Sequence, residues 1–123
     1  MSWTLGDTRP IYLQLSETIR QRIASGFYPE GSKIPSVRDL AREASVNPNT
    51  MQRAFSEPEA EDLIITQGTN GRFITQDKEK ISAVRERLAQ ELIEKFIADM
   101  ESIGINKQAV REKIKIIEVS GNG

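Results

Sequence analysis

The stretch "PSVRDLAREASVNPNTMQRAF" (Pro35–Phe55) has the pattern of two short helices in direct succession. Ser36 can cap the first helix, and Asp39 follows three residues later, close to the capping-box spacing. Asn47 can cap the second helix, with Pro48 as its first residue, where a missing backbone N–H costs nothing. The intervening "SVN" is too short for anything but a turn. The stretch therefore predicts two helices joined by a tight turn.

The second of these helices has two distinct faces. Its apolar positions follow the spacing i, i+3, i+4, i+7 and are Met51, Ala54, Phe55 and Pro58. The polar positions opposite them are Asn49, Gln52, Arg53 and Ser56. A mid-helix proline costs about 3 kcal/mol, so we expect the helix to break, running to about Ser56 with a fresh turn from Pro58. The same pattern predicts that leucine at position 58 would stabilise the protein.

Further elements are predicted on both sides of this helix pair. A preceding helix spans about Pro10–Ser25, with Thr8 as its cap and Gly26 at its end. Its inward stripe is Ile11, Leu15, Ile19 and Ile23. "SKI" (Ser32–Ile34) has the pattern of a short strand. Downstream, two β-rich runs, Leu63–Gln67 and Arg72–Gln76, flank "GTNG" and predict a hairpin.

The pattern changes after Gln76. "DKEKISAVRERLAQELIEKFIADMESIG" predicts one long amphipathic helix ended by Gly104, and Asn106 can cap a last helix through about Glu118. An appendage of about 45 residues cannot bury its own apolar stripe, so pairing with a second copy of the chain is the economical solution. The residues expected at that interface are Ile81, Val84, Leu88, Leu92, Phe96, Met100, Val110 and Ile114.

Composition excludes several classes of function. The 123 residues include neither cysteine nor histidine, which removes thiol–metal sites, the commonest general base and the commonest nitrogen metal ligand. With no phosphate-binding loop either, we expect no enzyme, no catalytic residues, no metal and no cofactor. No apolar run approaches a membrane span and the start lacks a signal sequence, so we expect no membrane partner and a cytoplasmic protein.

Charge argues against a nonspecific nucleic-acid binder. The net charge is −1, and residues 1–76 hold 8 Lys+Arg against 9 Asp+Glu. Any positive binding surface must therefore be local.

Helix, tight turn, helix and hairpin together form the plan of a winged helix-turn-helix. In that plan the second helix of the pair lies in the major groove of DNA, where Asn and Gln can read adenine and Arg can read guanine. The outward residues Asn49, Gln52 and Arg53 suit this use. Ser36 and Arg38 can hold phosphate at the start of the preceding helix. Arg72, beside the hairpin tip, can lie along the backbone or minor groove.

These residues carry a family resemblance. The region from Pro10 to about Gln76, and above all "PSVRDLA" and "VNPNTMQRA", resembles the DNA-binding domain of GntR-type bacterial transcription regulators of the YtrA-type subfamily. That subfamily follows its winged domain with a short two-helix segment. The resemblance implies DNA contacts at Ser36, Arg38, Asn47, Asn49, Thr50, Gln52, Arg53 and Gly71. Many relatives have Arg at the position of Pro48, so one frequent contact is absent.

The chain departs from this family at three structural positions. Similar sequences usually have Leu where Pro58 stands and Gly where Asp62 stands, and Ser45 replaces a common turn glycine. Asp62 can need a positive φ, which Asp tolerates better than most residues.

We therefore expect a mainly α fold with a small β-hairpin wing. Residues 1–76 form a winged helix-turn-helix DNA-binding domain, and residues 77–123 form a two-helix dimerisation segment. The expected function is a homodimeric repressor that binds a near-palindromic operator in double-stranded DNA; a small-molecule effector stays open. The alternative is a winged-helix module for protein–protein interaction, with the polar helix face as solvated surface.

Overall fold

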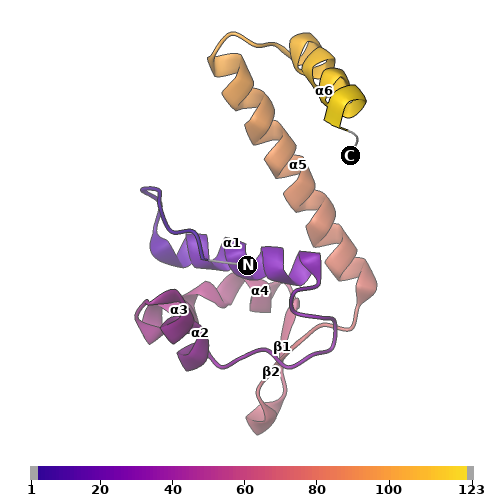
Figure 1. Ribbon diagram of the computed structural model, residues 1–123. Coiled ribbons are helices and arrows are strands. Elements are labelled where there is room, and N and C mark those ends of the chain that lie inside the picture. Colours follow the sequence, from indigo (N-terminus) through magenta and orange to yellow (C-terminus); the bar gives the residue numbers. More distant parts are fainter. Residues whose placement is uncertain (1–2, 122–123) are drawn as a thin grey trace. The chain divides into compact units, whose positions relative to one another are not determined.

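The computed structural model describes residues 3–121 and is mainly helical, with one small hairpin (Figure 1). In chain order the elements are α1 (Ile11–Ser25), α2 (Val37–Ala44), α3 (Pro48–Ala54), α4 (Ser56–Ala60), β1 (Ile64–Thr66), the 3-10 helix η1 (Gly68–Asn70), β2 (Arg72–Ile74), α5 (Lys78–Ser102) and α6 (Lys107–Gly121). This order confirms the predicted fold class, a winged helix-turn-helix followed by two C-terminal helices.

The core of the winged region forms where α1 and α2 both pack against α3. Its large apolar side chains are at most 1% exposed and include Leu15, Ile19, Ile23, Leu40, Met51, Phe55 and Ile74. The predicted stripe of α1 is thus confirmed except at Ile11, the first helical residue, which is 48% exposed. The predicted cap at Thr8 is wrong. The first hydrogen bonds of the helix go to the carbonyl of Pro10, which leaves Thr8 two positions too early.

The predicted break in the third helix is present but lies earlier in the chain. The helix α3 ends at Ala54, and a separate helix, α4, begins at Ser56. The backbone N–H of Phe55 bonds to Gln52 O at 3.2 Å, the tighter spacing typical of a last turn. Pro58 therefore lies in the first turn of α4, where proline is tolerated, and its ring is buried. Asp62, just beyond α4, has a φ of 58°, as expected.

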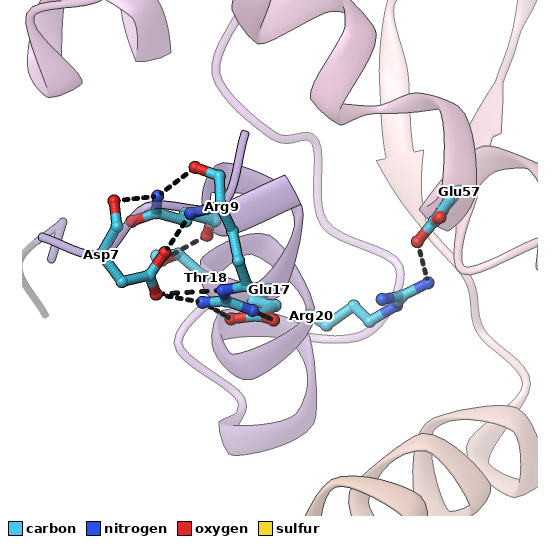
Figure 2. Close-up of polar contacts among 7 residues, drawn as sticks. Asp7, Arg9, Glu17, Thr18, Arg20 and Glu57 are labelled. Carbon is cyan, nitrogen blue, oxygen red and sulfur yellow. Dashed lines mark hydrogen bonds and ion pairs between the residues drawn. The ribbon is translucent and has the colours of Figure 1, made fainter. Parts of the chain in front are cut away.

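Arg20 ties α1 to α4. Its Nη2 lies 2.8 Å from Glu57 Oε2, and its Nε donates to Glu61 Oε1 at 2.9 Å. Figure 2 shows the Arg20 side chain reaching across to Glu57. This bridge fixes the short α4 against the first helix.

The segment before α1 is held by a second polar cluster. Arg9 pairs with both Asp7 and Glu17 (Figure 2). The buried side chain of Gln14 donates to Arg9 O at 2.8 Å. Hydrogen bonds from Arg9 hold the pKa of the Asp7 carboxyl below its ordinary value. The segment before α1 is therefore held by ion pairs of the Arg9 side chain and by a hydrogen bond to the Arg9 backbone.

Trp3 joins this segment to the far end of α1. Its ring centroid lies 4.2 Å from Cζ of Arg22, a guanidinium that is 1% exposed. Both Trp3 Nε1 and Arg22 Nη2 bond to Glu43 Oε1, at 3.1 and 3.0 Å, and Arg22 Nη1 bonds to the hydroxyl of Tyr28 at 2.6 Å. A buried charge is tolerated here because it is both paired and hydrogen-bonded.

The wing is an antiparallel pair in which Ile65 lies opposite Phe73. The paired strands are shorter than predicted, although one more bond on each side, such as Gln67 N to Gly71 O at 3.0 Å, extends the ladder. The predicted strand at "SKI" is reduced to a single bridge between Lys33 and Phe73. That bridge places Lys33 alongside the wing.

The chain forms two compact units, and the boundary falls within α5, between Arg85 and Glu86. The first turns of α5 belong to the winged unit, where Ile81 and Val84 are buried and Arg85 Nε donates to Ala24 O at 2.9 Å. Ile81 and Val84 therefore anchor α5 to its own chain, which differs from their expected place at a dimer interface. The second unit contains the rest of α5 and α6.

Within the second unit the predicted end of α5 and the predicted start of α6 are confirmed, whereas α6 runs to Gly121 and not only to about Glu118. Gly104 follows α5 with a φ of 87°, and Asn106 caps α6 by accepting from Ala109 N at 2.9 Å. Val110 is buried, so it too has little surface left for a partner. No helix in the described residues combines the length and apolar character needed to cross a membrane.

Candidate nucleic-acid interface

The turn between α2 and α3 is closed by a left-handed residue. Ser45 has a φ of 58° and a ψ of 46°, and the backbone N–H of Val46 returns to Ala41 O at 2.9 Å. This is the position at which the family usually has glycine, because L-residues other than Gly adopt this conformation at a cost. The strained turn sets α3 directly after α2.

The backbone of α3 starts as the sequence predicts. Asn47 Oδ1 accepts from Asn49 N at 2.7 Å, and Pro48 is the first helical residue. The cap uses the side-chain oxygen of Asn47, so only its amide N–H₂ is free to meet a ligand. Asn47 is thus a structural residue first and a candidate DNA contact second.

The two faces of α3 are separated as the spacing predicts. Met51, Ala54 and Phe55 are 0% exposed, whereas Asn49, Gln52 and Arg53 are exposed. Thr50 is half-buried at the edge between them. The row of exposed side chains offers amide and guanidinium groups, which can donate and accept at base edges.

Arg53 is held by a contact that the sequence did not reveal. Its Cζ lies 3.8 Å from the centroid of the Tyr12 ring, which belongs to the first turn of α1. The guanidinium is therefore supported on one face by an aromatic ring.

The start of α2 presents a second set of polar groups. Ser36 caps the helix by accepting from Asp39 N at 3.1 Å, and its hydroxyl proton is free to be donated elsewhere. Arg38 is exposed, and its side chain forms no hydrogen bond or ion pair with any of residues 3–121. A capped helix start beside an unengaged guanidinium suits an anion such as phosphate.

The wing tip lies beside this helix start. A groove of about 210 Å³ is lined by Lys33, Ile34, Pro35, Ser36, Val37, Thr69, Asn70, Gly71 and Arg72. Gly71 has a φ of 103°, and a Cβ there would come within 2.8 Å of Lys33 Cε. Glycine is therefore favoured at position 71 by its backbone conformation, whereas the flexible end of Lys33 could move aside for a Cβ.

Arg72 is engaged inside the domain. Its Nε donates to Glu59 Oε2 at 3.2 Å, and its Cζ lies 5.1 Å from the centroid of Phe55. Thr66 also donates to Glu59 Oε2, at 3.1 Å. These contacts brace the wing against α4, so the position of Arg72 in the fold is explained without DNA.

Two residues of this surface were missed by sequence reasoning. Lys33 reaches the wing because Ser32–Ile34 runs along β2, and the predicted strand at "SKI" was the signal that could have found it. Tyr12 reaches Arg53 because α1 crosses α3. No local spacing contains that information.

The gntR family of bacterial regulatory proteins has a model that matches residues 11–74, from the start of α1 to the end of the wing. The chain belongs to the GntR family. It is 35% identical over 114 residues to the HTH-type transcriptional regulator YhcF of Bacillus subtilis, covering 93% of this chain and 94% of that relative. It is 31% identical over 120 residues to the HTH-type transcriptional repressor YtrA of the same organism, covering 93% and 88%.

A solved structure supports the same assignment. The GntR family transcriptional regulator from Listeria monocytogenes superposes with a TM-score of 0.81 at 39% identity, covering 90% of this chain and 97% of that one. The similarity thus extends past the winged region into α5 and α6 of the GntR-family fold. As a member of this family, the chain is a DNA-binding transcription regulator of the winged helix-turn-helix type.

Proposed function

We propose that this GntR-family protein is a homodimeric repressor that places α3 in the major groove of a near-palindromic operator. The observation that carries the proposal is the separation of the two faces of α3. A fully buried face at Met51 and Phe55 fixes the helix, and the opposite face exposes Asn49 and Gln52.

The exposed side chains match the chemistry of base edges. Asn49 and Gln52 can each pair with adenine through one donor and one acceptor, and Arg53 can pair with guanine through two donors. Asn49 lies in the first turn of α3, the part of a recognition helix that approaches the bases most closely. Asn47 and Thr50 flank this row and contribute their remaining donors.

Phosphate contacts come from the groove at the wing. Lys33, Ser36 and Gly71 line it together, and Arg38 is exposed on the adjoining helix. A lysine ammonium, a hydroxyl and backbone N–H groups bind phosphate without regard to sequence. We therefore assign this groove to positioning, with the wing tip on the backbone or minor groove. Arg72 supports the wing from within.

The second unit supports the proposal of a dimer. Leu92, Phe96 and Ile114 are 61%, 46% and 42% exposed, and further exposed apolar side chains are Ile93, Ile103, Ile116, Ile117 and Val119. Leu88 and Met100, which lie on α5 with Leu92 and Phe96, are half-buried. Apolar exposure on this scale marks an interface, and a second copy can bury it in a four-helix arrangement of α5 and α6.

Repression is proposed because the relative YtrA, which shares 31% identity over 93% of this chain, is named a repressor. A dimer with two copies of α3 would read two half-sites, which is why we expect a near-palindrome. We place this activity in the cytoplasm, where the operator DNA is, and we propose no enzymatic activity.

The main alternative is a winged helix that binds another protein. The net charge of −1 is compatible with such a module. An amide- and arginine-bearing α3 favours DNA, because Asn, Gln and Arg match base edges, whereas a protein-binding helix would also tolerate apolar or acidic residues at these positions.

The test compares the DNA binding of two kinds of variant, those changed in α3 and one changed at Arg38, on an operator selected from genomic fragments. Asn49→Ala and Gln52→Ala should each cost about 1–3 kcal/mol on the operator and less on random DNA, because they read bases. Arg38→Ala should weaken binding to all sequences and lower the salt slope by about one, because it contacts phosphate.

Gel shifts over a range of salt concentrations give both quantities. If both α3 variants still preferred the operator over random DNA as strongly as the unmodified protein, the assignment of α3 as the recognition helix would be rejected. Failure of the intact chain to select any DNA would favour the protein-binding alternative.

A further inference from the structure

Arg53 rests against the flat face of the Tyr12 ring. The distance of 3.8 Å from its Cζ to the ring centroid is that of carbon atoms in van der Waals contact, so the guanidinium carbon lies directly over the ring. Tyr12 is half-buried in the first turn of α1, and Arg53 is exposed in the last turn of α3. The ring is therefore a fixed support, and the guanidinium is the accessible partner.

A second arginine on an aromatic ring gives an internal comparison. Arg72 also lies over a ring, that of Phe55, but its Nε is bonded to Glu59. In the described part of the chain no carboxylate is paired with Arg53. Arg72 thus uses its Nε donor within the domain, whereas no carboxylate in residues 3–121 takes up the N–H groups of Arg53.

This arrangement has a consequence for recognition. Stacking uses the face of a guanidinium and leaves its in-plane donors free to pair with guanine. An unsupported arginine must give up the freedom of its long side chain when it binds, whereas a stacked one has already lost part of it. A group held in one direction also distinguishes better between a correct and an incorrect base.

We propose that Tyr12 is a positioning residue that orients Arg53 for base recognition, so that α1 takes part in the sequence specificity of the regulator. The proposal rests on the proposed function of α3. It extends that function to a residue outside the helix-turn-helix, which would act on DNA only through Arg53.

The experiment measures base preference in the full-length chain. A selected operator is scanned with single base-pair changes, and the preference at each position is recorded for the unmodified protein and four variants. These are Arg53→Ala, Tyr12→Leu, Tyr12→Phe and the double variant Tyr12→Leu/Arg53→Ala. Thermal melting of each variant reports whether the winged unit is intact.

Arg53→Ala should flatten the preference at one position in each half-site. Tyr12→Leu should reduce the preference at that same position about two- to fivefold, the range of an exposed cation–π contact, and leave the other positions unchanged. Tyr12→Phe keeps the ring and should retain the preference. In the Arg53→Ala background, Tyr12→Leu should have no further effect.

Several outcomes would overturn the proposal. Equal loss at every position, or the same loss on random DNA, would give Tyr12 a general structural role. An effect of Tyr12→Leu that persists without Arg53 would show that the two residues act independently.

If Arg53→Ala leaves every position unchanged, Arg53 reads no base and the role of Tyr12 is rejected with it. The Asn49 and Gln52 variants would then decide separately whether α3 is the reading helix.

Discussion

Phe55 and Phe96 illustrate the difference between the two units of the chain. Phe55, in the winged unit, is 0% exposed and packs at the junction of α3 and α4, whereas Phe96, in the middle of α5, is 46% exposed. The same side chain is therefore core in one unit and surface in the other. The comparison shows that the winged unit buries most of its large apolar side chains, with Ile11 and Phe27 as exceptions, whereas the second unit leaves most of its own exposed.

The polar contacts follow the same division. In the winged unit, ion pairs such as Arg20–Glu57 and Arg72–Glu59 join separate elements. In the second unit, pairs such as Lys95–Asp99 link neighbours on a single helix. Pairs of this local kind stabilise a helix by only tenths of a kcal/mol and do not fix one helix against another. The exposed apolar side chains of the second unit and its local ion pairs therefore favour stabilisation by a partner.

The largest effect is expected from breaking the exposed apolar face of α5. Leu92→Asp combined with Phe96→Asp should convert the proposed dimer to monomers, because such a dimer would have to bury both charges. Loss of two-site binding should lower operator affinity by about 10²–10⁴-fold. The winged unit should keep its melting transition. Sedimentation equilibrium measures the mass of the protein in solution, gel shifts measure its operator affinity, and thermal melting follows the winged unit.

Ala98→Asp provides the matched control for this pair. Ala98 is exposed on the opposite side of α5 and receives the same negative charge. It should leave both mass and affinity unchanged. A Leu92/Phe96 variant that stayed dimeric, or a monomer with the affinity of the unmodified chain, would contradict the proposed interface.

The next effect compares the two phenylalanines directly. Phe55→Ala should destabilise the winged unit by about 3–5 kcal/mol, because it leaves a cavity in a close-packed core. Phe96→Ala should cost almost nothing at concentrations at which the protein is monomeric, and should matter only where it dimerises. Denaturant unfolding at two protein concentrations checks both expectations. Equal losses at both positions would show that Phe96 packs within its own chain.

Local features of the fold were predictable from the sequence. The caps at Ser36, Asn47 and Asn106 were predicted because a cap depends on residues within one turn. The buried and exposed faces of α3 followed from helical spacing in the same way. Positive φ at Asp62 followed from its place at a helix end.

Contacts between elements were not predictable. The anchoring of α5 by Ile81 and Val84 was missed because a stripe shows which residues are apolar and not which surface covers them. The pairing of Arg72 with Glu59 was missed because Glu59 lies on another element, and a DNA contact at Arg72 stays a prediction. The stack on Tyr12 was missed for the same reason.

The smallest effect concerns the tightness of the core in the winged unit. Pro58 is buried in the first turn of α4, so Pro58→Leu adds volume to a packed site at a cost of about 1–3 kcal/mol. The regained N–H lies in the first turn of α4, where it has no partner within that helix, so it returns little. We therefore expect a net loss of about 1–3 kcal/mol, the opposite of the gain that the helix pattern predicts.

Thermal melting of Pro58→Leu beside Pro58→Ala decides this point. Alanine removes volume instead of adding it and should also lower the midpoint. A raised midpoint for leucine would show that the site has room and that the break after Ala54 is caused by the proline.

The helix α5 runs without interruption from Lys78 to Ser102 and so passes through the boundary between the two units at Arg85. Because α5 is continuous, a change in its length alters both the distance along the helix axis and the rotation about that axis. One residue inserted after Arg85 would advance everything beyond it by about 1.5 Å and turn it by about 100°. Single-residue insertions and deletions would thus be screened out at this point, although each unit alone would accept them. Gain or loss of a whole repeat of about seven residues would nearly restore the phase, so changes in the length of α5 among relatives should occur in such steps.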